Sequence, residues 1–261
     1  ERFLEHRVGS RHPDQPARLT AVWDGLEAAG VDDALVRRTP RLAGKSDLLT
    51  VHPTEHLERL SLIDAAGGGR CDPDTVMGPQ SWTAARLAAG AGLAAIEGLC
   101  AGEADIAFCA VRPPGHHATP NRSMGFCLLN NLAVTARSLV GSGKRVVIVD
   151  VDAHHGNGTQ EIFYNEDEVL FISCHQWPLY PGTGSIDEMG SGPGMGTTIN
   201  VPLPPGAAGD DYRHVLNSVV VPAIERFRPD WLLVSAGFDA HRSDPLTDLG
   251  LTSTDYADLI V

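Results

Sequence analysis

Two stretches of the sequence join an apolar run to residue types that bind metal ions. One run covers residues 145–152, ends at Asp152 and is followed closely by His154. The other covers residues 231–239 and ends at Asp239. Two carboxylates and one imidazole leave a fourth position for water, which is the form of a catalytic zinc site. We therefore expect one zinc ion per chain, held by these three residues.

A structural interpretation of the same carboxylates is weaker. An isolated pair such as Asp150 and Asp152 often caps backbone donors at the end of a strand. Here two histidines follow the pair, and a second strand-end aspartate lies far downstream. The immediate neighbours of the three ligands include no Lys or Arg. A buried carboxylate needs a positive partner, and a dication supplies one.

A third stretch, residues 112–118, carries the adjacent histidines His116 and His117. Near a water activated by a metal, one imidazole acts as general base and then as general acid. The other stays cationic and polarises the substrate. His155 remains ambiguous and is not assigned as a ligand. A surface, capping or core role is expected for the remaining histidines, which are His6, His12, His52, His56, His175, His214 and His241.

The elements that must position these residues alternate along the chain. Apolar runs of strand length cover residues 104–111, 145–152, 169–175, 197–203 and 231–239. They are continuously apolar, as in parallel strands buried on both faces. Helical patterns cover residues 81–100, 130–141, 210–227 and 253–261. The alternation predicts an α/β fold, a mostly parallel sheet with helices on both faces. The candidate residues follow strand ends, where such folds bind ligands.

Composition narrows the class of protein. The chain has 261 residues, 43% of them hydrophobic, and a net charge of −13, which argues against non-specific nucleic-acid binding. No linker divides it, so we expect a single domain over residues 1–261. No apolar run is long enough to span a membrane. Five cysteines without a C-x-x-C pair favour free thiols in a reducing compartment, the cytoplasm.

The motifs together resemble the zinc-dependent histone deacetylase superfamily, which includes acetylpolyamine amidohydrolases and bacterial acetoin-utilisation proteins. The resemblance is carried in order by residues 12–18, 112–118, 125–127, 150–158, 180–184, 235–239 and 244–245. In detail it is closest to the bacterial, class II-like branch. It implies a three-layer arginase/deacetylase fold, with zinc on Asp152, His154 and Asp239. It also implies that His117 is the general base and acid, and that His116 is its electrostatic partner.

The resemblance assigns supporting roles as well. Asp150 would orient His116, and Asn157 would orient His117. Because an amide carries no charge, it should leave that imidazole less basic than an aspartate would. A structural potassium ion is implied at the Asp150 and Ser173 side chains and at the backbone carbonyls of Asp152, His154 and Cys174.

Two aromatic residues in Gly- and Pro-rich loops, Phe126 and Tyr180, are either ordinary core residues or rim residues. By resemblance they are walls of an acyl-lysine tunnel, with Leu246 at its mouth. The family also uses a transition-state tyrosine downstream of the third ligand, a donor worth roughly 10²–10³ in turnover. The sequence does not reach that segment, so we expect a piece of a longer protein, truncated at both ends.

The predicted reaction is hydrolysis of an acyl amide to acetate and a free amine. The expected substrate is an acetylated lysine in a peptide or protein, and the alternative is an acetylpolyamine or another small acyl amide. An arginase-type hydrolase would need carboxylates for a second metal, where this chain has Gly156 and His241. A catalytically silent acyl-lysine-binding or assembly subunit stays open only because the tyrosine segment is not reached. The oligomeric state is open.

Overall fold

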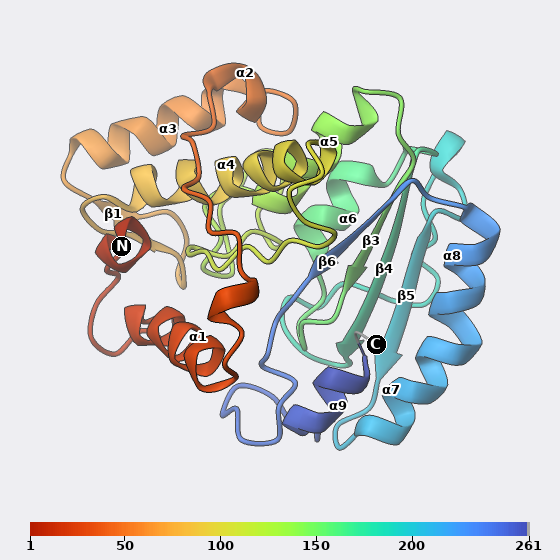
Figure 1. Ribbon diagram of the computed structural model, residues 1–261. Helices are drawn as coiled ribbons and strands as arrows, with labels where there is room; N and C mark the ends of the chain where they lie inside the picture. Colours follow the sequence, from red (N-terminus) through yellow and green to blue (C-terminus); the bar gives the residue numbers. More distant parts are fainter. Residues whose placement is uncertain (260–261) are drawn as a thin grey trace. The chain divides into compact units, whose positions relative to one another are not determined.

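The computed structural model describes residues 1–259 of the chain, which separates into two compact units (Figure 1). Unit 1 comprises Glu1–Ser138 and unit 2 comprises Leu139–Val261. The expected helix at residues 253–261 is present as α9 (Ser253–Asp258), and residues 260–261 lie outside the described part. Among the described residues, no helix is long and apolar enough to cross a membrane.

Unit 1 is mainly helical. Its helices are η1 (Arg2–Glu5), α1 (Pro16–Ala28), η2 (Asp32–Ala34), α2 (Lys45–Leu48), α3 (Thr54–Ala65) and α4 (Ser81–Cys100). The strands β1 (Gly69–Arg70) and β2 (Val76–Met77) form a short antiparallel hairpin. The alanine-rich face of α4 contributes Ala84 and Ala88 to a core with Phe3 and Leu19. Helix α5 (Asn131–Val140) runs from unit 1 into unit 2.

Unit 2 is built on a four-stranded parallel sheet in the order β5-β4-β3-β6. The strands are β3 (Val146–Asp150), β4 (Val169–Gln176), β5 (Thr198–Leu203) and β6 (Trp231–Ser235). Its helical segments are α6 (Asn157–Phe163), η3 (Gly192–Gly194), α7 (Gly209–Val215), η4 (Leu216–Val220), α8 (Val221–Phe227) and α9. Every residue of β3 and β4 is buried, as the continuously apolar pattern predicts. The predicted α/β fold is confirmed.

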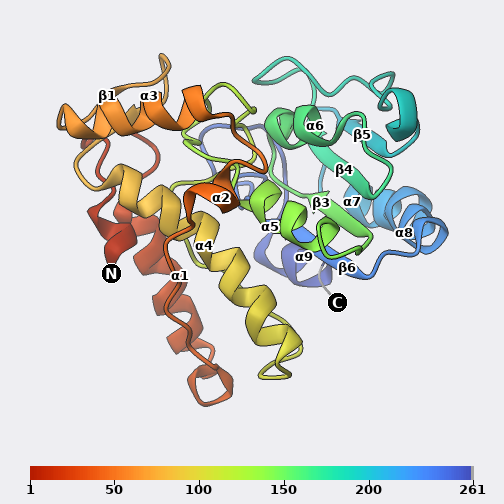
Figure 2. The same ribbon diagram turned by 90° about the horizontal axis from the view of Figure 1, so that it is seen from above.

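Both faces of this sheet carry helices. The chain moves across the sheet in one direction from β3 to β4 and returns in the other from β5 to β6. Because parallel crossovers are right-handed, helix α6 and the pair α7–α8 fall on opposite faces, as Figure 2 shows. On the α7–α8 face, Val147, Val149 and Ile172 pack against Tyr212 and Val215. The π-helical turn η4 lies just before Pro222, which has no N–H for the helical ladder.

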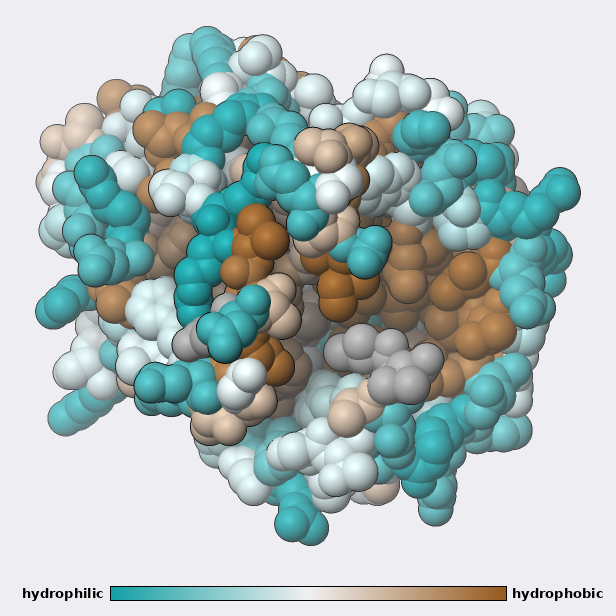
Figure 3. Space-filling model, in the orientation of Figure 1, coloured by the Kyte–Doolittle hydropathy of each residue, from teal (hydrophilic) through white to brown (hydrophobic). Residues whose placement is uncertain are grey.

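Two predicted strands differ from expectation. Residues 104–111 form no strand, and Ile106 and Phe108 are 87% and 58% exposed. Strand β6 ends at Ser235, short of the expected residue 239, and exposes Leu232 and Val234. Among the described strands, β6 pairs with β3 alone, so it is an edge strand. Hydrophobic residues gather over the sheet region of unit 2 in Figure 3. Apolar sequence gives a buried strand only where a partner is present.

Candidate active site

Three predicted metal ligands meet at the carboxyl ends of two neighbouring strands. Asp152 and His154 follow β3, and Asp239 follows β6, which pairs with β3 in parallel register. Their ligand atoms all lie within 4.8 Å of one another. The next strand along the chain, β4, lies on one side of β3, and β6 lies on the other side of β3. This is a reversal of strand order, the place where open α/β sheets bind ligands.

Hydrogen bonds fix the two carboxylates. Asp152 Oδ1 accepts from the His154 backbone N–H at 2.8 Å, and Asp239 Oδ1 accepts from Ala153 N–H at 2.8 Å. A Cβ on Gly237 would lie 2.0 Å from Asp152 Oδ2, so only glycine leaves room for that carboxylate. The donor set is thus held in place by backbone geometry, as a metal site requires.

The three side chains share one strong electrostatic field. His154 Nδ1 lies 2.7 Å from Asp239 Oδ2 and 3.2 Å from Asp152 Oδ1. Burial alone lowers the pKa of His154, but hydrogen bonds and attraction from the two carboxylates raise the pKa to about 10. Burial and repulsion from Asp152 raise the pKa of Asp239 to about 6, against the opposing effect of His154. One buried and one half-buried carboxylate around one imidazole nitrogen fit a divalent cation in the position that the proton otherwise takes.

The residues expected around potassium lie beneath this cluster. Asp150 is the last residue of β3, is fully buried and stands in register with Ser173 of β4. Its Oδ1 accepts from the Asp152 backbone N–H at 3.2 Å. Burial and the negative charge of Asp150 raise the pKa of the neighbouring Cys174 to about 12. Because Asp150 and Ser173 stand opposite each other on neighbouring strands, the two side chains expected to bind potassium are neighbours.

Tyr180 lies beside the metal cluster, with its ring edge-on to His154 at a centroid distance of 6.2 Å. Leu246 is partly exposed, and its backbone N–H donates to Asp244 Oδ1 at 2.9 Å. His155 turns away from the ligand set: its Nδ1 lies 2.8 Å from Thr183 Oγ1, and it is buried. Asn157 is the first residue of α6.

The histidine pair lies in unit 1, on a loop without regular secondary structure. His116 and His117 are both buried, with ring centroids 3.9 Å apart. A Cβ on Gly125 would lie 2.2 Å from Cδ2 of His117, and Gly125 has a φ of +56°. Only glycine therefore allows the turn at Phe126 to pack against this imidazole. The turn is held in place because the Phe126 backbone N–H donates to Thr75 Oγ1 at 3.0 Å.

Two stacked, buried histidines support the histidine loop, residues 112–130. His52 Nδ1 lies 3.1 Å from the Pro120 carbonyl, and His52 Nε2 accepts from Asn130 N–H at 2.9 Å. His56 Nε2 lies 3.3 Å from the Leu128 carbonyl. Burial and repulsion from His56 lower the pKa of His52 to about 4. His52 is thus a neutral side chain that carries its proton on Nδ1 and joins the middle of the loop, at Pro120, to its end, at Asn130.

A buried ion pair holds the start of the loop. Arg112 Nε donates to Asp14 Oδ1 at 2.7 Å, and its other N–H groups donate to backbone carbonyls of Phe3, His6 and Asp14. Burial alone raises the pKa of Asp14, but contacts with His6 and Arg112 hold that pKa well below its ordinary value. Sequence reasoning missed the roles of Asp14 and Arg112, whereas the buried position of His52 agrees with the surface, capping or core role expected for it. The only signal for Asp14 and Arg112 was their place in matched motifs, because they lie far apart in the sequence.

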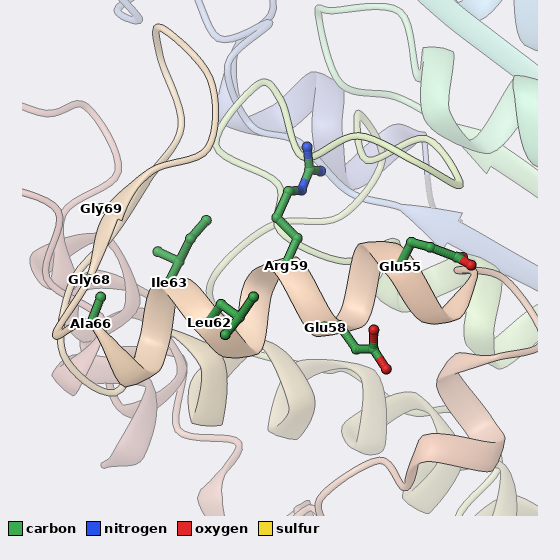
Figure 4. Close-up of a pocket in the computed structure, with 8 residues that line it drawn as sticks. All are labelled: Glu55, Glu58, Arg59, Leu62, Ile63, Ala66, Gly68 and Gly69. Atoms are coloured by element: carbon green, nitrogen blue, oxygen red, sulfur yellow. The ribbon is translucent and has the colours of Figure 1, made fainter.

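A separate cleft of about 460 Å³ lies along α3 (Figure 4). Leu62 and Ile63 line it, and the carboxylates of Glu55 and Glu58 point in different directions. Its acidic groups thus do not converge as the Asp152–His154–Asp239 cluster does. The structure brings together the three metal ligands in unit 2, and the histidine pair and Phe126 in unit 1.

Comparisons with known proteins identify the family of the chain. A family model, the histone deacetylase domain, matches residues 12–261. A probable deacetylase of Archaeoglobus fulgidus is 42% identical over all of this chain and 73% of the relative. A histone deacetylase-like amidohydrolase of Pseudomonas aeruginosa is 41% identical, over 97% of the chain and 68% of the relative.

Solved structures are similar over nearly the whole chain. The HD domain of HDA15 is 40% identical with a TM-score of 0.94, over 99% of this chain and 75% of that one. An acetylpolyamine aminohydrolase from Burkholderia pseudomallei is 29% identical with a TM-score of 0.89, over 99% and 86%. The family match and the similar folds lead to one conclusion: the chain belongs to the histone deacetylase family of amidohydrolases.

Proposed function

We propose that this protein is a zinc-dependent deacetylase that hydrolyses the acetyl amide of acetylated lysine side chains in peptides or proteins. The observation that carries the proposal is the convergence of Asp152, His154 and Asp239 at the reversal of strand order. Two carboxylates and one imidazole are a donor set that zinc accepts while keeping a position open. The match of residues 12–261 to one family supports the view that both units form a single deacetylase domain.

The donor set defines what the metal contributes. When bound, zinc polarises the acyl carbonyl and lowers the pKa of water. Asp152 and Asp239 supply the negative charge that holds a dication, and His154 binds through Nδ1, which must then be unprotonated. Potassium on Asp150, Ser173 and nearby carbonyls would neutralise a buried carboxylate directly below these ligands.

The histidine pair supplies the proton transfers. An unprotonated nitrogen of His117 takes a proton from the attacking water as the new C–O bond forms. The same proton then passes to the amine nitrogen as the C–N bond breaks, so acetate and a free amine leave. His116 stabilises the developing oxyanion through its ring N–H, which carries partial positive charge. We propose that Asp150 orients His116 and that Asn157 orients His117, as the family resemblance implies.

We propose a substrate channel lined by three side chains, as the family resemblance implies. Phe126 and Tyr180 are proposed as its aromatic walls, and the edge contact of Tyr180 with His154 supports this for one of them. Leu246 offers an apolar mouth suited to the stem of a lysine side chain. The acetylpolyamine aminohydrolase of similar fold makes an acetylated polyamine the second candidate substrate.

An assay with two substrates tests the proposal. The full-length protein, loaded with zinc, is given an acetyl-lysine peptide or N8-acetylspermidine, and released acetate is measured with and without prior chelation. We expect faster turnover of the peptide, and loss of it after chelation. Turnover of acetylspermidine but not of the peptide would show that the substrate is an acetylated polyamine. No turnover of either, with zinc bound, would favour a silent acyl-lysine binder.

A further inference from the structure

The observation behind this inference is a second cleft in unit 1, of about 500 Å³, formed by the segment around residues 8–13 and the β1–β2 hairpin. Arg11, His12, Arg70 and Asp74 are the polar side chains of charged or titratable type that line it, and Phe126 forms part of its wall. A volume of this size falls within the range of ligand-binding clefts. Neither the metal cluster nor the histidine pair accounts for it.

Positive charge is concentrated in this cleft although the chain is acidic overall. Arg11 and Arg70 bring two guanidinium groups, while Asp74 is the one carboxylate among its lining residues. Arg70 Nη1 donates to the Pro73 carbonyl at 2.6 Å, and neither guanidinium has a carboxylate partner among the described residues. The whole chain has a net charge of −13, so the sign of the charge in this cleft is opposite to that of the protein. Guanidinium groups bind carboxylates and phosphates by paired hydrogen bonds.

Asp74 offsets only one of the two arginine charges, and its Oδ1 also helps to build the wall of the cleft. Asp74 Oδ1 accepts from Thr75 Oγ1 at 2.7 Å and from the Gly125 backbone N–H at 3.1 Å. The His12 ring donates to the Asp74 carbonyl at 2.9 Å. The ring of His12 also meets Phe126 edge-on, at a centroid distance of 4.5 Å. The cleft and the Gly125–Phe126 turn are thus one hydrogen-bonded structure.

The position of Phe126 links the cleft to the reaction. Its neighbour Gly125 packs against the ring of His117, and Phe126 is a proposed wall of the acyl-lysine channel. A peptide whose acetyl-lysine passes Phe126 advances by about 3.3 Å for each extended residue. Its flanking residues therefore reach the cleft within one or two positions of the lysine.

We propose that this cleft binds an anionic side chain, a carboxylate or a phosphate, that flanks the acetylated lysine of the substrate. The proposal rests on the proposed deacetylase function and makes it narrower: Arg11 and Arg70 select acetyl-lysine in acidic or phosphorylated sequence. Specificity would come from the two guanidinium groups, and the shape of the cleft from the Asp74 hydrogen bonds.

Matched peptides test the proposal. In one set, Glu replaces Gln at each of the two positions on either side of acetyl-lysine, and in another, phosphoserine replaces serine. At one position or more, kcat/KM should rise about three- to tenfold for the anionic peptide, as expected for exposed ion pairs acting together. A rise for Glu and phosphoserine marks a general anion subsite, whereas a rise for phosphoserine alone restricts it to phosphorylated substrates.

Variants locate the effect. The double variant Arg11→Gln with Arg70→Gln should abolish the preference and leave kcat/KM for the neutral peptide unchanged. Arg2→Gln, which removes an exposed positive charge from the same unit outside the cleft, should retain the preference. An equal loss on neutral and anionic peptides, a preference that survives the double variant, or no preference at all would overturn the proposal.

Binding separates this proposal from the proposed function. Fluorescence anisotropy of the same labelled peptides reports affinity without turnover. If no peptide is hydrolysed, the deacetylase function fails, but tighter binding of the anionic peptide that the double variant removes still supports the cleft. If peptides are hydrolysed and bound without regard to charge, the cleft proposal fails and the deacetylase function stands.

Discussion

The metal cluster of unit 2 and the histidine loop of unit 1 are positioned by different physical means. Asp152, His154 and Asp239 follow strands whose register fixes where the side chains begin. His116 and His117 lie on a loop that is fixed by side chains from other segments, such as Arg112. The cluster carries net negative charge that a cation must balance, whereas the loop is held by neutral histidines and one internally compensated ion pair.

This difference predicts how each region fails. Changing a strand-end ligand removes a donor but leaves the sheet intact, so chemistry should be lost before stability. Changing a support of the loop removes a hydrogen bond or a counter-charge from a buried position, so stability should be lost as well. The contrast is sharpest where a variant affects one property and spares the other.

The largest effect is expected for Asp239→Ala. The variant removes one of three protein ligands and one of two carboxylates, so zinc per chain should fall well below one after dialysis. Turnover should drop on the order of a thousandfold, the several kcal/mol that a catalytic metal supplies. Zinc is measured by mass spectrometry and stability by urea unfolding. Asp167→Ala, an exposed acid of the same unit, should retain zinc. A full equivalent of zinc in folded Asp239→Ala would refute the assignment.

The histidine pair should respond unequally. His117→Ala removes the proton carrier and should lower kcat about 10²–10⁴-fold, the usual range for general acid–base catalysis. His116→Ala should cost less, because polarisation of the carbonyl by zinc remains. Zinc content should stay near one in both variants. Steady-state kinetics of the two proteins decide the matter, and equal losses would contradict the separate roles.

Asp14→Ala should show the opposite behaviour to Asp239→Ala. It leaves the buried Arg112 guanidinium without its carboxylate, at a cost of about 3–5 kcal/mol in unfolding free energy. Zinc should still bind in the fraction that stays folded. Asp47→Ala removes a half-buried partner of Arg41 and an acceptor of the Gly44 N–H, and should cost only about 1 kcal/mol. If both variants destabilise equally, the buried pair does not support the loop.

A smaller effect is expected at the proposed channel mouth. Leucine attracts no cation, so the wild type should prefer acetyl-lysine peptides to N8-acetylspermidine in kcat/KM. Leu246→Glu should shift the ratio toward the polyamine by about one to two decades, as expected for one desolvated charge pair. Leu246→Gln keeps the size and lacks the charge, so it serves as the control. A wild-type preference for acetylspermidine would place the selecting carboxylates elsewhere.

The sequence is most informative where neighbours along the chain decide the structure. Strands β3 and β4 follow from their continuous apolar runs, and the metal ligands follow from where these runs end. Residues 104–111 are also mostly apolar but form no strand, because pairing depends on a partner that local sequence does not specify. The support of the loop is equally non-local, since Asp14 and Arg112 are 98 positions apart. Distant contacts of single polar residues leave no periodic signal.

The smallest predicted effect concerns acid sensitivity in unit 1. His52 has a pKa of about 4 in the folded protein, against an ordinary histidine pKa of 6.5 in the unfolded chain. Between these values the unfolded chain binds the proton that folded His52 refuses, so stability is full above pH 6.5 and falls as the pH drops toward 4. From pH 7 to pH 5 this amounts to about 2 kcal/mol.

His52→Gln should lack that part of the pH dependence, whereas His214→Gln, at an exposed position, should keep it. Urea unfolding at both pH values measures the difference. An unchanged slope in His52→Gln would mean that the neutral imidazole does not hold the loop, and that hydrogen bonds such as Ser123 Oγ to the Leu128 carbonyl, at 2.8 Å, suffice.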